Sequence, residues 1–111
     1  MSTPIQPMRY RPTAEGLERW FGPLEAAVMA EAWAGRGPRT VKQIWRALAG
    51  RELSYTTVMT TMFRLVDKGL LSRARPLGGV AHLYAPTCSK AEFVELQTRA
   101  IVASLESERG A

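Results

Sequence analysis

The residues best suited to chemistry lie in one predicted helix in the middle of the chain. One side of this helix carries short hydroxyl groups and one long cation, namely Thr56, Thr57, Thr60 and Arg64. Threonine hydroxyls bond phosphates and base edges, and threonine methyls contact the thymine methyl. Threonine is also a weak helix former, so four threonines within residues 56–61 are unusual for a plain solvent-facing helix. We therefore predict that this face contacts DNA, against the alternative of a threonine-rich helix tolerated by its packing.

Other cations flank this helix in the sequence. Arg73 and Arg75 are two residues apart in a predicted strand, so they lie on one side of it, and His82 is expected across from them. They are candidates for phosphate or minor-groove contacts, although charges on an edge strand also serve solubility alone. The helix before the threonine helix adds three candidates for phosphate contact: Arg39, Lys42 and Arg46. An outward Phe63 is expected to pack under the hairpin or against an N-terminal arm rather than contact thymine methyls.

The chain offers little for catalysis or metal binding. His82 and Cys88 are its single histidine and single cysteine, too few for a nucleophile–base pair or a structural zinc site. No glycine-rich phosphate loop is present. Cys88 is interpreted as a small residue after the hairpin, with thiol oxidation as the open alternative. We predict a non-enzyme without metal or cofactor, in the cytoplasm and without a membrane segment or secretory signal.

Capping signals place the helices. The first helix opens at Gly22-Pro23, and Gly35 with Gly37-Pro38 ends it. The second starts at a capping box of Thr40 and Gln43 and is expected to end at Gly50. Three further signals follow along the chain: an N-cap at Ser54, a C-terminal glycine at Gly69, and a second capping box of Ser89 and Glu92 that opens the last helix.

A change of period between the third and last helices predicts a β-hairpin. Residues 71–75 and 80–84 form two short extended runs around a Gly78-Gly79 turn. Three helices followed at once by a hairpin have the layout of a winged helix-turn-helix. We expect a mainly α-helical fold with a small β-hairpin wing: an extended arm at 1–18, the winged helix-turn-helix domain at 19–87 and a C-terminal helix at 88–111.

Charge supports a polyanionic partner for the central module. The chain carries a formal net charge of +5, and residues 36–90 contain ten basic side chains against two acidic ones, Glu52 and Asp67. Each cation that meets a phosphate releases condensed counterions, so such a module suits double-stranded DNA. A basic protein without a nucleic-acid partner is the alternative that charge leaves open.

Three segments resemble the penicillinase-repressor family of winged-helix regulators (the BlaI/MecI/CopY group). They are Phe21-Gly22-Pro23-Leu24-Glu25-Ala26-Ala27-Val28-Met29, then Tyr55-Thr56-Thr57-Val58-Met59-Thr60-Thr61 with Arg64-Leu65 and Lys68-Gly69-Leu70-Leu71, and finally Tyr84-Ala85-Pro86 with Ser89 through Phe93. The resemblance covers residues 20–95. It implies a homodimeric repressor that binds a dyad-symmetric operator, with C-terminal helices forming the dimer.

The chain lacks two features through which members of this family respond to a signal. It has no cysteine pair, which argues against a copper-type response, and no asparagine, so it lacks the Asn-Phe cleavage pair of the antibiotic-responsive members. A sensor or protease partner therefore stays unidentified. Val80 and Leu83 stand where basic wing residues are common in the family. The last helix is short for the family's dimerisation region, but its apolar residues are expected to be exposed and to pair with a second copy: Phe93, Leu96, Ile101 and Leu105.

Together these features predict a sequence-specific DNA-binding repressor that acts as a homodimer. A winged-helix module that binds another protein, without operator binding, is the alternative. It would be favoured if the basic surface proved discontinuous in three dimensions. The operator sequence, the regulated genes and the inducing signal are not encoded in any pattern of this chain.

Overall fold

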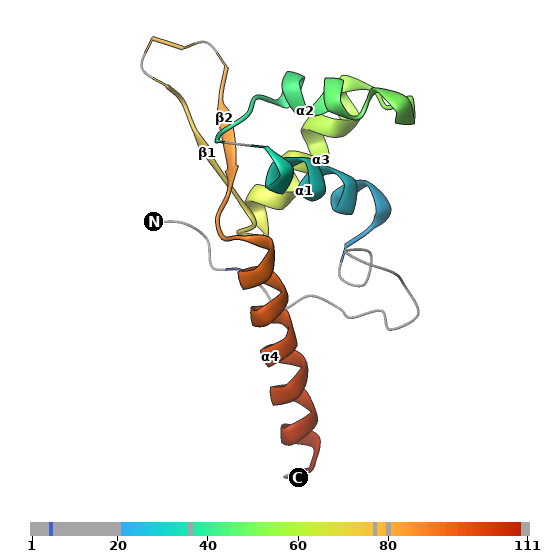
Figure 1. The fold of residues 1–111 in the computed structure, drawn as a ribbon, viewed down its shortest axis with the longest axis vertical. Helices are drawn as coiled ribbons and strands as arrows, with labels where there is room; N and C mark the ends of the chain where they lie inside the picture. Colours follow the sequence, from blue (N-terminus) through green and yellow to red (C-terminus); the bar gives the residue numbers. More distant parts are fainter. Residues whose placement is uncertain (1–4, 6–20, 36, 77, 80, 110–111) are drawn as a thin grey trace.

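The computed structural model describes residue 5 and residues 21–35, 37–76, 78–79 and 81–109. Within these residues the elements run in the predicted order, three helices, a hairpin and a last helix (Figure 1). Their bounds are α1 Pro23–Ala34, α2 Val41–Ala47, the short 3-10 helix η2 Ala49–Arg51, α3 Tyr55–Asp67, β1 Leu71–Ala74, β2 Leu83–Pro86 and α4 Lys90–Arg109. The winged-helix layout is confirmed. The predicted arm lies outside the described residues except for Ile5, which packs against the core.

The core lies between α1, α2, α3 and the base of the wing. The inner face of α3 is the predicted one, and its four members are nearly inaccessible: Val58, Thr61, Met62 and Leu65. Thr61 is the one polar residue of this face, and its hydroxyl donates to the Thr57 carbonyl oxygen at 2.9 Å. A buried hydroxyl that finds a partner one turn back avoids the cost of an unsatisfied polar group.

The capping signals in the sequence correspond to observed hydrogen bonds. Thr40 and Gln43 exchange both bonds of a capping box before α2, and Ser89 and Glu92 do the same before α4. The prediction for the end of α2 was wrong. The helix stops at Ala47, Gly50 lies inside η2, and the chain turns at Glu52 in the left-handed region (φ 53°). A 3-10 turn continued past the helix end, so the glycine was not needed as the stop.

The end of α3 sets the position of the wing. Gly69 has a φ of 81°, the Leu70 amide donates to the Leu65 carbonyl oxygen, and the Gly69 amide donates to that of Val66, both at 2.9 Å. These two bonds form a Schellman motif, which glycine favours because it has no Cβ to clash at positive φ. Leu65 and Leu70 are both buried in the core cluster, as expected for the two positions whose apolar side chains meet in this motif.

The wing is a two-stranded antiparallel sheet that a third segment extends. Its register pairs Leu71 with Pro86 and ends with Ala74 opposite Leu83. The second strand therefore starts at residue 83, later than the predicted run of 80–84, and Val80 lies outside the described residues. Arg39 adds an isolated bridge to Tyr84, with amide-to-carbonyl bonds of 2.9 and 2.8 Å in the two directions. The link before α2 is thus joined to β2.

The last helix leaves the domain at an angle and extends away from it (Figure 1). Its first turns are anchored by Phe93, which is fully buried and stacks on Phe21 with 5.1 Å between ring centroids, beside Trp33 at 5.6 Å. The expectation that Phe93 is exposed for dimerisation was wrong, because this ring completes the core of its own chain. None of the described helices is both long and apolar enough to cross a bilayer.

We expect Phe93→Ala to lower the free energy of unfolding by about 3–5 kcal/mol, because a large ring leaves a cavity among Phe21 and Trp33. Leu96→Ala is the matched control on the same helix. Its side chain is exposed, so a change of under about 1 kcal/mol is expected. Urea unfolding of both variants measures the difference. Equal, small losses would contradict the placement of Phe93 in the core.

Candidate nucleic-acid interface

The outer face of α3 presents the predicted hydroxyl-rich surface. Thr56, Thr57, Thr60 and Arg64 are all exposed. The hydroxyl of Thr57 lies 2.7 Å from that of Ser54, whose oxygen also accepts from the Thr57 amide at 3.1 Å. This N-cap orients Thr57 at the start of the helix, where it lies beside the exposed Thr56. The face is therefore ordered by the helix itself and open to a partner.

The cations of the described chain fall into two groups. One group is held in ion pairs that connect or brace elements: Arg39 with Glu31, Lys68 with Glu25 at 2.7 Å, and Arg99 with Glu95. The other group forms none of these pairs and is exposed. Besides Arg51 and Lys90, it includes five of the cations predicted to contact DNA: Lys42, Arg46, Arg64, Arg73 and Arg75. Unpaired exposed cations keep their charge available for phosphates.

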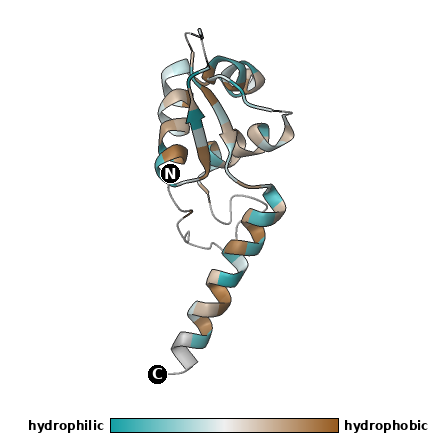
Figure 2. Ribbon diagram, turned by 90° about the vertical axis from the view of Figure 1, so that its left-hand side faces the viewer, coloured by the Kyte–Doolittle hydropathy of each residue, from teal (hydrophilic) through white to brown (hydrophobic). Residues whose placement is uncertain are grey.

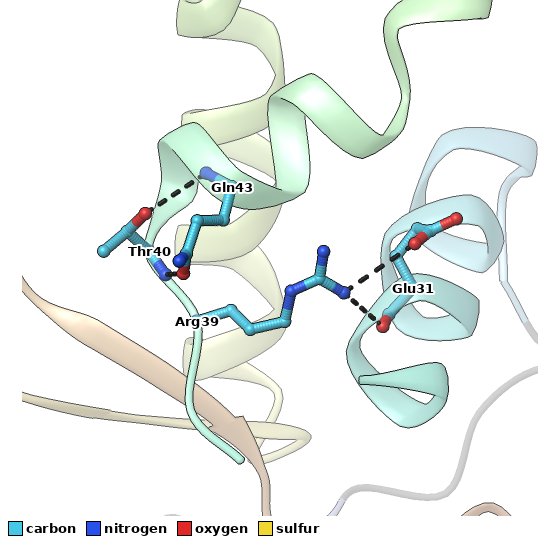
Figure 3. Close-up of polar contacts among 4 residues, drawn as sticks. All are labelled: Glu31, Arg39, Thr40 and Gln43. Atoms are coloured by element: carbon cyan, nitrogen blue, oxygen red, sulfur yellow. Dashed lines mark hydrogen bonds and ion pairs between the residues drawn. The ribbon is translucent and has the colours of Figure 1, made fainter. Parts of the chain in front are cut away.

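Arg39 does not belong with the available cations. Its guanidinium points to the last turn of α1, where it donates to the Glu31 carbonyl oxygen at 2.9 Å and lies 3.7 Å from the Glu31 carboxylate (Figure 3). The same view shows Thr40 and Gln43 closing the capping box beside it. Arg39 was suggested for phosphate contact, but its position assigns it to joining α1, α2 and β2. These two contacts with Glu31 hold the Arg39 side chain, and the backbone bridge to Tyr84 fixes the link that carries it.

Arg73 links the wing to α3. Its guanidinium carbon lies 5.4 Å from the centroid of the Phe63 ring, within cation–π distance. The expectation that Phe63 packs under the hairpin is confirmed by this contact. His82 was expected across from Arg73 and Arg75. The register pairs Arg73 with Tyr84 and stops at Ala74 with Leu83, so His82 lies one residue beyond the ladder and pairs with neither. His82 instead lines a hollow between the wing and the helices.

The hollow beside His82 was not predicted from the sequence. It has a volume of about 390 Å³ and lies between the start of α2, the outer side of α3 and β2. Tyr55, Met59 and Phe63 form its α3 wall, and they recur four residues apart, so they share one side of the helix. This four-residue spacing is visible in the sequence and could have indicated an apolar wall on this side of α3. Tyr55 is held by an edge-on contact with the Trp45 ring at 5.7 Å.

The described residues favour neither a metal site nor a reactive thiol. Among the described residues, no group of three or more His, Cys, Asp or Glu side chains is placed to hold a metal ion. Burial raises the pKa of the Cys88 thiol, and the neighbouring Glu92 carboxylate raises it further. A raised pKa reduces the thiolate fraction, and the thiolate is the reactive form. This disfavours the oxidation switch that the sequence left open.

Comparison with known proteins gives a consistent result. Residues 21–110 match the family model described as Penicillinase repressor. The chain is also similar to two proteins named Transcriptional regulator BlaI, from two strains of Mycobacterium tuberculosis, each 46% identical over 75 residues. The matched segment covers 67% of this chain and 53% of each relative, so the chain spans about half the length of these curated relatives.

The contact between Phe63 and Arg73 can be measured with a double-mutant cycle. We expect Phe63→Leu and Arg73→Gln to show a coupling free energy of roughly 0.5–1 kcal/mol, because the leucine keeps apolar bulk but removes the ring face that attracts the cation. Chemical denaturation of the two single variants and the double variant supplies the numbers. Strictly additive losses would mean that the wing is not held to α3 by this pair.

Proposed function

The chain belongs to the penicillinase repressor family, and on this premise we propose that it is a sequence-specific DNA-binding transcriptional repressor that binds a dyad-symmetric operator as a homodimer. The observation that carries the proposal is the grouping of unpaired, exposed cations on α2, α3 and the wing, around a hydroxyl-rich helix face. The cations that form ion pairs, Arg39, Lys68 and Arg99, connect or brace elements of the fold instead. Such a division suits a surface whose partner supplies the negative charge.

In this proposal α3 enters the major groove. Thr56 and Thr60 are one turn apart, so their methyl and hydroxyl groups reach adjacent base edges. Arg64 lies one turn beyond Thr60 and binds either a guanine edge or a phosphate. These three residues would supply the sequence preference, and Thr57, oriented by Ser54, would contribute at the start of the helix.

The remaining cations would position the protein on the duplex. Arg73 lies in β1 and Arg75 directly after its end, while Lys42 and Arg46 lie one turn apart on the supporting helix α2. Contacts of this kind go to the phosphate backbone and carry little sequence information. The protein would therefore act by binding alone, without a catalytic group or cofactor, and in the compartment that holds its DNA, the cytoplasm.

The homodimer in this proposal uses one face of α4. At about 100° per residue, steps of three and four residues keep three side chains in line: Thr98, Ile101 and Leu105. Val94 continues this line toward the domain but packs against the core of its own chain. Val102 flanks this line, and Val102 and Leu105 are 47% and 57% exposed. Apolar residues recur along the part of the helix that extends from the domain (Figure 2). A second copy of the same stripe would bury them in a coiled-coil seam.

Leu96 does not fit this seam. It is 44% exposed, but it lies about 180° around the helix from Leu105. The four residues predicted for dimerisation therefore divide: Ile101 and Leu105 share the proposed seam, Phe93 belongs to the core, and Leu96 faces elsewhere. This division makes Leu96 a control for the dimer.

The first test of the function is a gel shift against DNA upstream of the protein's own gene, with excess non-specific competitor. We expect a discrete complex that resists competitor and weakens steeply between about 50 and 200 mM salt, because phosphate contacts release counterions. A shift that competitor abolishes on every fragment would favour the protein-interaction alternative instead.

Arg64→Ala is expected to act in one of two measurable ways. If Arg64 binds a phosphate, affinity falls for every sequence, and the slope of log K against log salt loses about 0.9 per bound site. If Arg64 reads a base, discrimination at one operator position falls by about 1–3 kcal/mol. Fluorescence anisotropy at several salt concentrations separates the two. Arg99→Ala, on α4, is the control, and identical behaviour of both variants would remove Arg64 from the interface.

Ile101→Lys combined with Leu105→Lys is expected to give a folded monomer, because four charges would meet in the seam of a dimer. Analytical ultracentrifugation measures the mass, and circular dichroism confirms the fold. Leu96→Lys should leave the oligomeric state unchanged. If the double variant sediments like the unmodified chain, α4 does not form the dimer through this face.

A further inference from the structure

We propose that the hollow between α2, α3 and β2 binds a planar aromatic acid, and that this ligand and DNA compete for the protein. The competition rests on the proposed function, whereas the ligand site itself does not. About 390 Å³ is within the range of small-molecule pockets. Nothing in the family match or in the names of the relatives assigns a ligand to this position.

The first argument comes from exposed apolar surface. Five large apolar side chains of the described residues are well exposed, and three of them lie on α4. The other two are Tyr55, 42% exposed, and Phe63, 38% exposed, and both line this hollow. Leaving two aromatic side chains open on one small domain has a cost in hydration, and a bound ring would remove that cost.

The second argument comes from the polar groups of the lining. Among the described residues, the polar members of the lining are Lys42, His82, Thr40, Tyr55 and Tyr84, and none of them carries a carboxylate. Lys42 forms no ion pair with any described residue. A carboxylate on the ligand would complement Lys42, while the ring of the ligand lies among Tyr55, Met59 and Phe63. An aromatic cation would gain no such partner.

Duplex DNA is a poor occupant of the same hollow. The faces of its bases are stacked on one another, and extruding a base to reach an aromatic wall costs several kcal/mol. A free aromatic acid presents its ring without that cost. The hollow is nevertheless continuous with the proposed interface, because Phe63 is both a wall of the hollow and the ring that contacts Arg73.

Competition follows from the shared groups. A ligand carboxylate at Lys42 would neutralise one of the cations proposed to bind phosphate. A ring against Phe63 would also occupy the space beneath the wing, where Arg73 is held. A ligand that uses these groups in the free protein cannot be fully accommodated when the same groups contact DNA, so each would weaken the binding of the other.

The ligand site is tested on the full chain without DNA. In ¹H–¹⁵N NMR titrations with 2-naphthoate, benzoate and indole-3-acetate, we expect saturable shifts at residues of the lining, with a Kd of about 1 mM or tighter for at least one acid. The neutral 2-naphthamide should bind more weakly than 2-naphthoate. If no acid gives saturable shifts up to roughly 10 mM, or if the shifts centre on α4, the site is wrong.

Two variants show whether the hollow itself is responsible. Lys42→Gln should reduce the preference for 2-naphthoate over 2-naphthamide, and Lys90→Gln, a cation on α4, is its control. Ala81→Trp places a ring into the hollow from an exposed position on the wing side and should abolish binding of both probes. Unchanged binding in Ala81→Trp, with a native-like spectrum, would overturn the assignment.

The competition is tested separately with the operator fragment. At a ligand concentration ten times its Kd, strict competition raises the apparent Kd for DNA about tenfold. An unchanged DNA affinity at saturating ligand would refute the competition but keep the site. Failure of the protein to bind DNA at all would refute the proposed function, and the NMR shifts would still decide the ligand site.

Discussion

Gly69 takes the chain out of α3 in the left-handed conformation, and the wing depends on this single reversal. Leu70 and Leu71 follow it into the core, so β1 starts directly against the helix that it has just left. Thr87 closes the other end of the hairpin: its hydroxyl donates to the Gly69 carbonyl oxygen at 2.7 Å and its amide to that of Leu70 at 3.0 Å. The two strands are thereby fastened to the C-terminal end of α3.

The contacts farther along the wing follow from this fastening. Only with β1 starting at Leu71 does Arg73 come to lie over Phe63, and only with β2 ending near Thr87 does Tyr84 reach Arg39. A side chain at Gly69 would strain the turn, and the effect would reach the proposed DNA surface without touching any residue in it. The geometry of the proposed DNA surface thus depends partly on a buried glycine outside it.

The division of the cations shows how a basic protein separates structural from available charge. Glu25 and Glu31 on α1 neutralise Lys68 and Arg39, which hold α1 against the end of α3 and against the link before α2. Two acidic residues of the domain, Glu25 and Glu31, therefore pair within the fold, and the cations of α2, α3 and the wing form no ion pair with any described residue. Net charge alone would not separate these groups, because all of these side chains count equally in it.

Much of the fold was predictable because it depends on interactions between residues that are close together in the sequence. Capping boxes at Thr40 and Ser89, the glycine at 69 and the inner stripe of α3 act within a few residues, and the structure reproduces them. The errors concern contacts between distant residues. Phe93 looked like part of an exposed stripe because its partners, Phe21 and Trp33, are 72 and 60 positions away in the chain. The pairing of Arg39 with Glu31 and Tyr84, and the hollow beside Phe63, likewise require the tertiary arrangement.

The bridge between Arg39 and Tyr84 has a consequence for how such a protein can evolve. Its two backbone bonds close the chain into a loop that contains α2, α3 and β1, and therefore nearly all of the surface proposed to meet DNA. The helix α4 joins this loop from outside, just past its closing point, with Phe93 as its anchor. Changes of length or sequence in the outer turns of α4 leave the closure intact. A lineage built on this plan can vary the outer part of α4 while inheriting the proposed DNA surface unaltered.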